Sequence, residues 1–260
     1  MFRQDEAEFP QKRLETAFLH SLRLMDQDRE YLQMHLQQTG DARTMQTLAD
    51  MELESARLER TFRELIELSA PETELQKRPV DLCQLVGQLA RMRTEIEAQS
   101  QTTLRVEAPG MERCLVWGDR EKAEQICFHL LSNALYATAP GGNITVCLKK
   151  NEQTIVLTVE DDGCGLPEGE SWMENRRRFL GGAQAGLMLC HRYCRQLGWE
   201  LELLPRSPKG VCARLTLPQP THPFPIETTV EFCSDAGLSH PTQLQYQLRR
   251  ELYLLVHRQS

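Results

Sequence analysis

The fold is decided by two stretches of sequence, HLLSNALYATAPGG at residues 129–142 and VEDDGCGLP at residues 159–167. Between them lie two runs rich in β-branched residues, at 144–148 and 155–160, with a short polar turn between the runs. This pattern predicts a β-hairpin, because branched residues favour strands and polar residues favour the turn. The second stretch therefore begins where a strand ends.

Helices and strands alternate on both sides of this hairpin. The apolar spacing predicts helices at about 80–98, 119–138 and 185–197, and further strands at 103–108, 115–117, 200–204 and 211–217. Short connections favour antiparallel neighbours, and the helices would cover one face of the sheet. The sequence therefore predicts an α+β protein whose residues 71–218 form a two-layer α/β sandwich.

The residues before this domain have a different pattern. Apolar residues recur at intervals of three and four in two stretches, which predicts one apolar seam on each of two long helices. The seams contain Leu14, Phe18, Leu22, Met25, Leu32 and Leu36, and then Leu48, Met51, Leu58, Phe62 and Leu65. A turn-like segment at 38–41 separates them, so residues 1–70 are predicted to form an antiparallel helical hairpin. Because two helices cover only part of such seams, we expect a homodimer that completes a four-helix bundle.

Composition excludes some classes of partner. The chain has 260 residues, with 30 Lys and Arg against 37 Asp and Glu, which gives a net charge of −7. No nucleic-acid partner is expected from this balance. No run of about 18 uncharged apolar residues occurs, and the charged start MFRQDEAEF is unlike a signal peptide. We therefore expect a cytoplasmic chain without a membrane span.

Nine cysteines are scattered along the chain without a Cys-x-x-Cys pair, which predicts buried, reduced thiols. Cys190, His191 and Cys194 lie within about one helical turn and could suggest a metal site. No second cluster of ligands accompanies them, so packing is the favoured interpretation.

Asn133 and Asp161 are candidates for nucleotide binding. The side-chain oxygen of Asn133 could be a ligand of Mg²⁺, which prefers oxygen ligands. Asp161, at a strand end, could accept a hydrogen bond from an adenine amino group, and Gly163 and Gly165 would let the backbone approach a ligand. The alternatives are a solvated asparagine and a tight turn.

A third motif, GGAQAGL at 181–187, opens a predicted helix. Free amide groups at a helix N-terminus bind phosphate, and Gly182 and Gly186 carry no side chain that would block it. A Gly-Gly pair before a helix is also a common loop. Each motif alone is weak evidence, whereas the order and spacing of all three are specific.

In this order, the motifs resemble the ATP-binding catalytic domain of bacterial two-component sensor histidine kinases. In that family an asparagine box and two glycine boxes line one ATP cleft under a lid. The resemblance implies ATP and Mg²⁺ as cofactors, with Asn133 as the metal ligand and Asp161 bound to the adenine amino group. The pocket would be shaped by Gly163, Gly165, Gly182 and Gly186. His129 occupies the first position of the asparagine box, where the family has Asn and related ATPases have Glu, and is a candidate catalytic residue.

The resemblance extends upstream to ARLERTFRELIELSA at 56–70 and RPVDLCQLVGQLARM at 78–92. His20 precedes Leu68 by 48 residues, about where the family has its phosphoacceptor histidine, and FLHSLR at 18–23 keeps the outline His-x-Leu-Arg. His20 also lies off the apolar seam, so we expect it to be accessible. The resemblance implies transfer of the γ-phosphoryl group of ATP to His20 and relay to a response regulator.

Three departures from the family pattern keep other functions open. Ser21 replaces the acidic residue that follows the family's histidine, Gln184 replaces a glycine, and only 16 residues separate Gly165 from Gly182, which implies a short lid. The alternative is a degenerate kinase that acts as a nucleotide-binding or non-catalytic dimeric scaffold. A third possibility, a serine kinase like the anti-sigma-factor kinases, is disfavoured by the long hairpin. No role is predicted for residues 219–260.

Overall fold

The computed structural model describes residues 5–36, 42–72, 74–110, 112–166, 183–221 and 243–259. The chain divides into two compact units, residues 1–71 together with 256–260, and residues 72–255. None of the helices in the described ranges is both long enough and apolar enough to span a membrane.

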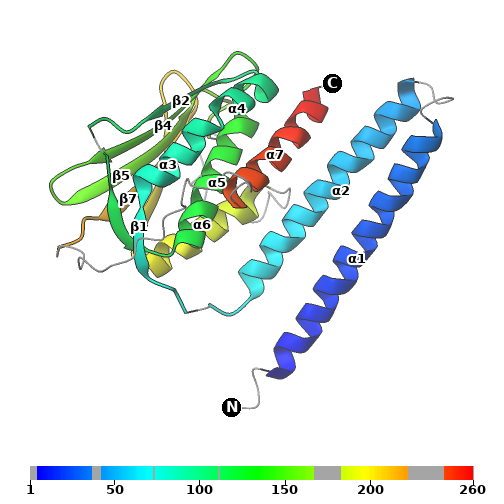
Figure 1. Ribbon diagram of the computed structural model, residues 1–260, viewed down its shortest axis with the longest axis horizontal. Coiled ribbons are helices and arrows are strands. Elements are labelled where there is room, and N and C mark those ends of the chain that lie inside the picture. Colours follow the sequence, from blue (N-terminus) through cyan, green and yellow to red (C-terminus); the bar gives the residue numbers. More distant parts are fainter. Residues whose placement is uncertain are drawn as a thin grey trace. The chain divides into compact units, whose positions relative to one another are not determined.

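The N-terminal unit contains two long helices, α1 (Asp5–Leu36) and α2 (Ala42–Ser69) (Figure 1). The rings of Phe18 and Phe62 stack with their centroids 3.8 Å apart. Further along α1, Asp26 accepts a hydrogen bond of 3.2 Å from the hydroxyl of Ser55. Asp26 follows Phe18 in α1, whereas its partner Ser55 precedes Phe62 in α2. The two helices therefore run antiparallel.

The apolar surface of these two helices is only partly covered within one chain. Leu22 and Leu48 are each 6% exposed. Large apolar side chains that stay exposed are Leu24, Met25, Tyr31, Leu32, Met34, Met51, Leu58 and Leu65. Several of them belong to the predicted seams, so one hairpin alone leaves apolar surface in contact with water.

The larger unit is built on a five-stranded mixed sheet in the order β2-β4-β5-β7-β6. Its strands are β2 (Thr103–Glu107), β4 (Asn143–Lys150), β5 (Thr154–Asp161), β6 (Glu200–Pro205) and β7 (Val211–Pro218). Strands β2 and β4 are parallel, and the other neighbours are antiparallel. A separate pair joins β1 (Arg78–Asp81) to β3 (Leu115–Gly118).

Strand β5 shows how the sequence directs a candidate site residue into the interior. Buried residues alternate with less buried ones along it, and Ile155, Leu157 and Val159 are the buried set. Because side chains alternate between the faces of a strand, Asp161 falls on the same face as these three. Its carboxylate is therefore directed into the layer that contains the apolar core.

Helices cover one face of the sheet, as Figure 1 shows for α3, α5 and α6. The helices of this unit are α3 (Leu82–Arg91), α4 (Arg93–Ser100), α5 (Arg120–Ala137), α6 (Ala183–Leu197) and α7 (Gln243–Gln259). Helix α5 begins after Asp119, whose carboxylate accepts a hydrogen bond of 3.3 Å from the backbone N–H of Lys122. Such a cap stabilises the first helical turn. The predicted two-layer sandwich with a mixed sheet is confirmed.

The predicted single helix at 80–98 is wrong. Residues 78–81 form β1, because they pair with β3, and Asp81 then caps α3 by accepting a hydrogen bond of 3.0 Å from the N–H of Cys83. At Met92 the backbone leaves regular helical geometry, with φ −85° and ψ −3°, and α4 follows. In the C-terminal tail the structure describes α7, whereas residues 222–242 lie outside the described residues.

Candidate functional site

The candidate nucleotide residues come from three elements. His129 and Asn133 lie one turn apart on α5, so they share a face of that helix. Asp161 ends β5, and Gly163 and Gly165 follow it. Gly182 lies outside the described residues, as does the side chain of Gln184 in α6.

Two glycines allow these elements to approach one another closely. A Cβ atom on Gly163 would lie 2.3 Å from the carbonyl oxygen of Ala137, at the end of α5. A Cβ atom on Gly186 would lie 2.6 Å from Nδ1 of His129. Both distances are far below van der Waals contact, so Gly163 and Gly186 are needed for packing against α5. Their part in shaping a pocket stays a prediction.

Asp161 is a buried carboxylate that the backbone holds in place. It is 4% exposed, and its Oδ1 accepts hydrogen bonds from the N–H groups of Gly163, at 2.9 Å, and Val211, at 3.3 Å. Burial raises the pKa of Asp161, although these two N–H groups and the nearby Arg206 act in the opposite direction. Among the described residues, no hydrogen bond to Oδ2 occurs, so this oxygen is suited to accept one from a ligand.

The turn between β6 and β7 clamps the backbone of Asp161. Arg206 donates a hydrogen bond of 2.8 Å from Nη1 to the carbonyl oxygen of Asp161, and its Nη2 lies 3.3 Å from a carboxylate oxygen of Glu160. Gly210 has φ +107°, and a Cβ atom there would lie 2.0 Å from the same carbonyl oxygen. Sequence reasoning missed both Arg206 and Gly210, because they are distant from Asp161 in the sequence.

We expect Arg206→Gln to raise the pKa of Asp161 further, because the guanidinium is one of the groups that lower it. A carboxyl group with a raised pKa keeps its proton in the folded state at pH values where the unfolded chain has lost it. Its contribution to stability is therefore complete below pH 3.8 and is lost as the pH rises through the folded pKa. In Arg206→Gln this loss should extend to higher pH.

Carboxyl-carbon NMR titration would measure the pKa, and urea unfolding at several pH values would measure the stability. A suitable control is Arg214→Gln, because Arg214 pairs with Glu202 at 3.6 Å on the same sheet. An equal change of the Asp161 pKa in both variants would contradict a specific effect of Arg206.

Asn133 and His129 have different surroundings. The amide nitrogen of Asn133 is buried and makes no hydrogen bond within the described part of the chain. The imidazole of His129 is 3% exposed and lies against Gly186, so it fills space between α5 and α6. A catalytic role for His129 stays a prediction. The unsatisfied amide nitrogen of Asn133 is a donor that suits a phosphate oxygen, and its amide oxygen is the atom type that Mg²⁺ prefers.

His20 is exposed on α1, in the other unit. The hydroxyl of the neighbouring Ser21 donates a hydrogen bond of 3.0 Å to the carbonyl oxygen of Ala17. Ser21 is thus engaged with its own helix. The role of His20 as phosphoacceptor stays a prediction.

The described cysteines are free thiols, and most of them are buried, as predicted. Burial raises the pKa of Cys127 and of Cys194 to about 12. The cysteines that flank His191 are fully buried, and in the described ranges no group of three His, Cys, Asp or Glu residues could hold a metal ion. Cys164, between Gly163 and Gly165, is exposed.

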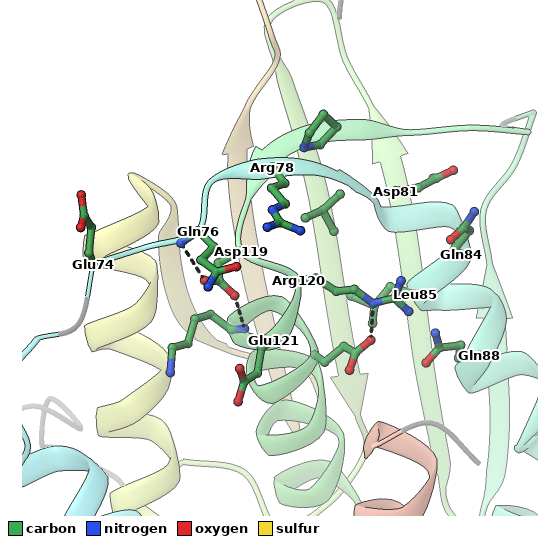
Figure 2. Close-up of a pocket in the computed structure, with 14 residues that line it drawn as sticks. Glu74, Gln76, Arg78, Asp81, Gln84, Leu85, Gln88, Asp119, Arg120 and Glu121 are labelled. Carbon is green, nitrogen blue, oxygen red and sulfur yellow. Dashed lines mark hydrogen bonds and ion pairs between the residues drawn. The ribbon is translucent and has the colours of Figure 1, made fainter. Parts of the chain in front are cut away.

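A polar cleft of about 450 Å³ lies at the N-terminal end of α5, away from the turn that carries Asn133. It is bounded by β1, α3 and the first turn of α5 (Figure 2). Three of its charged side chains have partners at the cleft. Arg120 pairs with Glu124 at 2.9 Å, and Asp119 accepts hydrogen bonds from the N–H groups of Gln76 and Lys122. None of the predicted nucleotide residues lines this cleft.

A family model matches part of the larger unit. Residues 118–221 match the family of histidine kinase-, DNA gyrase B-, and HSP90-like ATPases. This range contains α5, β5, α6 and the clamp on Asp161.

Curated relatives are sensory and sporulation kinases. The chain is 30% identical to the adaptive-response sensory kinase SasA of Thermosynechococcus vestitus over 59% of its own length and 43% of the relative. It is 28% identical to the sensor histidine kinase MtrB of Mycobacterium leprae over 73% of its own length and 37% of the relative. For sporulation kinase A of Bacillus subtilis the identity is 22%, over 64% and 28%. The chain thus spans less than half the length of these relatives.

Solved structures share the fold. Full-length ShkA in complex with AMPPNP has a TM-score of 0.59 at 18% identity, over 82% of this chain and 46% of that one. Histidine kinase ThkA in complex with response regulator TrrA has a TM-score of 0.57 at 18% identity, over 84% and 64%. The comparisons agree with the resemblance stated from the motifs: residues 118–221 match the model of the histidine kinase-, DNA gyrase B-, and HSP90-like ATPases, and the similar curated proteins include sensory and sensor histidine kinases.

Proposed function

We propose that the chain is the core of a sensor-type histidine kinase, which binds ATP and Mg²⁺ and transfers the γ-phosphoryl group to His20. A response regulator, the proposed cytoplasmic partner, would then accept the phosphoryl group from His20. The observation that supports this most is the buried carboxylate of Asp161, which is fixed by backbone N–H groups and keeps one oxygen for a ligand.

In the proposed complex, each residue has a defined part. Asp161 accepts a hydrogen bond from the adenine amino group, and its burial excludes competing water. The amide oxygen of Asn133 would hold Mg²⁺ and its amide nitrogen would donate to a phosphate oxygen; bound Mg²⁺ would supply positive charge for the transferring group. Gly163, Gly165, Gly182 and Gly186 keep side chains out of the space that the nucleotide occupies.

Two measurements test this function. Calorimetric titration of the whole chain with ATP, with Mg²⁺ and then with a chelator, should show binding that weakens without the metal. Incubation with γ-labelled ATP should give label that is lost in acid and kept in base, which is characteristic of phosphohistidine. Absence of any binding at millimolar ATP would refute nucleotide binding, and binding without labelling would leave the scaffold as the function.

The scaffold is the second candidate, because the neighbourhood of His20 favours it. The hydroxyl of Ser21 is bound to the carbonyl oxygen of Ala17 and cannot serve as a general base near neutral pH. Gln184 would also narrow the approach to the phosphates. In this case ATP, if bound, would stabilise the fold without being consumed.

We also propose that two copies of the chain pair through α1 and α2. Apolar side chains along this hairpin stay exposed within one chain, Leu58 at 53% and Leu65 at 49% among them. They continue the seams that the sequence predicts, and a second hairpin presents the same apolar stripe. A four-helix bundle covers both stripes at once.

We expect Leu58→Glu to dissociate the dimer, because a charge at this position would be buried between copies. The mass measured by light scattering at tens of micromolar should fall from that of a dimer to that of a monomer, and the helical content should not change. The control is Arg43→Glu, an exposed position on the same helix. Phe62→Glu is less suitable, since Phe62 stacks on Phe18 within one chain and its loss would open the hairpin. A monomeric starting protein would refute the dimer.

A further inference from the structure

Helix α7 lies alongside α5 on the outer side of the larger unit (Figure 1). Three leucines on its inner face, Leu244, Leu248 and Leu252, are completely buried. Their spacing of four residues gives α7 one continuous apolar stripe. Arg249, on the outer side, forms an ion pair of 3.0 Å with Glu95 of α4. Residues 243–255 of the helix are therefore an integral part of this unit.

Two polar contacts fix the register between α7 and α5. Gln125 donates a hydrogen bond of 3.3 Å to Gln247, and two turns further along α5 the hydroxyl of Ser132 donates one of 3.3 Å to Glu251. The order of the contacts is the same on both helices, so α7 runs in the same direction as α5. These contacts place the middle of α7 beside the turn of α5 that precedes Asn133.

The contact between Ser132 and Glu251 is buried. Ser132 is 0% exposed and Glu251 is 4% exposed. Placing a carboxylate in such surroundings costs free energy, and an apolar residue of similar size would avoid that cost. The hydrogen bond restrains the backbone at Ser132, and Asn133 is the next residue.

We propose that α7 is a C-terminal brace of the nucleotide site, in which Glu251 is a positioning residue that holds Ser132 and thereby orients Asn133 toward Mg²⁺. This inference rests on the proposed nucleotide function of Asn133. It assigns a role to the segment for which the sequence alone predicted none. The brace acts on the metal-bound part of the nucleotide and not on the adenine end, where Asp161 is held by the turn between β6 and β7.

The test compares Glu251→Leu and Glu251→Gln in the whole chain. Leucine fills the same buried position but removes the acceptor of the Ser132 hydroxyl, so ATP binding in Mg²⁺ should weaken about fivefold or more. Binding of ATP in a chelator should not change. Glutamine keeps an acceptor oxygen, so Glu251→Gln should bind ATP with Mg²⁺ like the starting protein.

Hydrogen exchange provides a readout that needs no nucleotide. In Glu251→Leu, amide exchange at residues 129–137 should accelerate, whereas exchange in α3 should not. The control is Arg249→Gln, which removes the exposed ion pair with Glu95 from the same helix and should alter neither exchange nor binding.

The outcomes separate the two proposals. If the starting protein fails to bind ATP, nucleotide binding is refuted, and the brace is refuted with it as a device of that site. If ATP binds but Glu251→Leu shows unchanged exchange at 129–137 or an unchanged dependence on Mg²⁺, the brace alone is refuted. A fall in melting temperature with equal loss of binding in Mg²⁺ and in chelator would also refute it, since that result indicates a structural role.

Discussion

His20→Ala is expected to abolish incorporation of label from γ-labelled ATP, and Ser21→Glu is expected to increase it. A neutral imidazole is abundant at pH 7 and can attack a phosphoryl group. It lacks a neighbour that fixes its tautomer and takes the departing proton, because the hydroxyl of Ser21 is bound to the carbonyl oxygen of Ala17. A general base contributes roughly 10²–10⁴-fold to such a rate. Ser21→Glu should therefore raise the labelling rate by a factor that approaches this range.

The initial rate of acid-labile, base-stable labelling measures this effect. Ser21→Gln is the control, because it has the size of glutamate without its basicity. If His20→Ala and Ser21→Glu both label like the starting protein, His20 is not the acceptor and the scaffold is the better function. Equal gains in Ser21→Glu and Ser21→Gln would show that size, rather than proton transfer, limits the rate.

Asp161→Ala is expected to weaken ATP binding by about 1–3 kcal/mol, or roughly 5–150-fold. Removing the carboxylate leaves the adenine amino group without its acceptor in a buried place. The same change also deprives the N–H groups of Gly163 and Val211 of their acceptor, so the melting temperature should fall. Calorimetric titration and thermal unfolding measure the two effects.

The adjacent Asp162 offers a matched control. Its carboxylate accepts hydrogen bonds of 2.9 Å from both the backbone and the side chain of Asn143, which lower its pKa. Asp162→Ala should therefore affect stability while leaving the affinity for ATP nearly unchanged. Equal losses of affinity in Asp161→Ala and Asp162→Ala would indicate that the adenine position is misassigned.

The parts of the site that the sequence predicts are those encoded by local periodicity. Strand β5 alternates strictly, so the position of Asp161 in that alternation predicts that its side chain faces inward. The helical period of α5 likewise places His129 and Asn133 on one face. Burying one whole face of a helix or strand outweighs the weak preferences of single residues. Both elements begin and end within one or two residues of their predicted bounds.

The rest depends on contacts between residues that are distant in the sequence. The interaction of Arg206 and Gly210 with Asp161 exists only after β7 has paired with β5. The pairing of β1 with β3 turns residues 78–81 into a strand although an apolar helical pattern begins there. Neither contact leaves a periodic signal in one sequence. Docking of α7 is similar, because its stripe predicts a buried face without specifying what covers it.

The buried thiols of the larger unit allow its local opening to be measured by chemical modification. A thiol with a pKa of about 12, such as that of Cys127 or Cys194, is about 10⁵-fold less ionised at pH 7 than at its midpoint, and only the thiolate reacts with alkylating agents. Cys127 lies in α5 and Cys194 in α6, the two helices that meet at Gly186. The time course of their alkylation therefore measures how often these helices separate, without an engineered label.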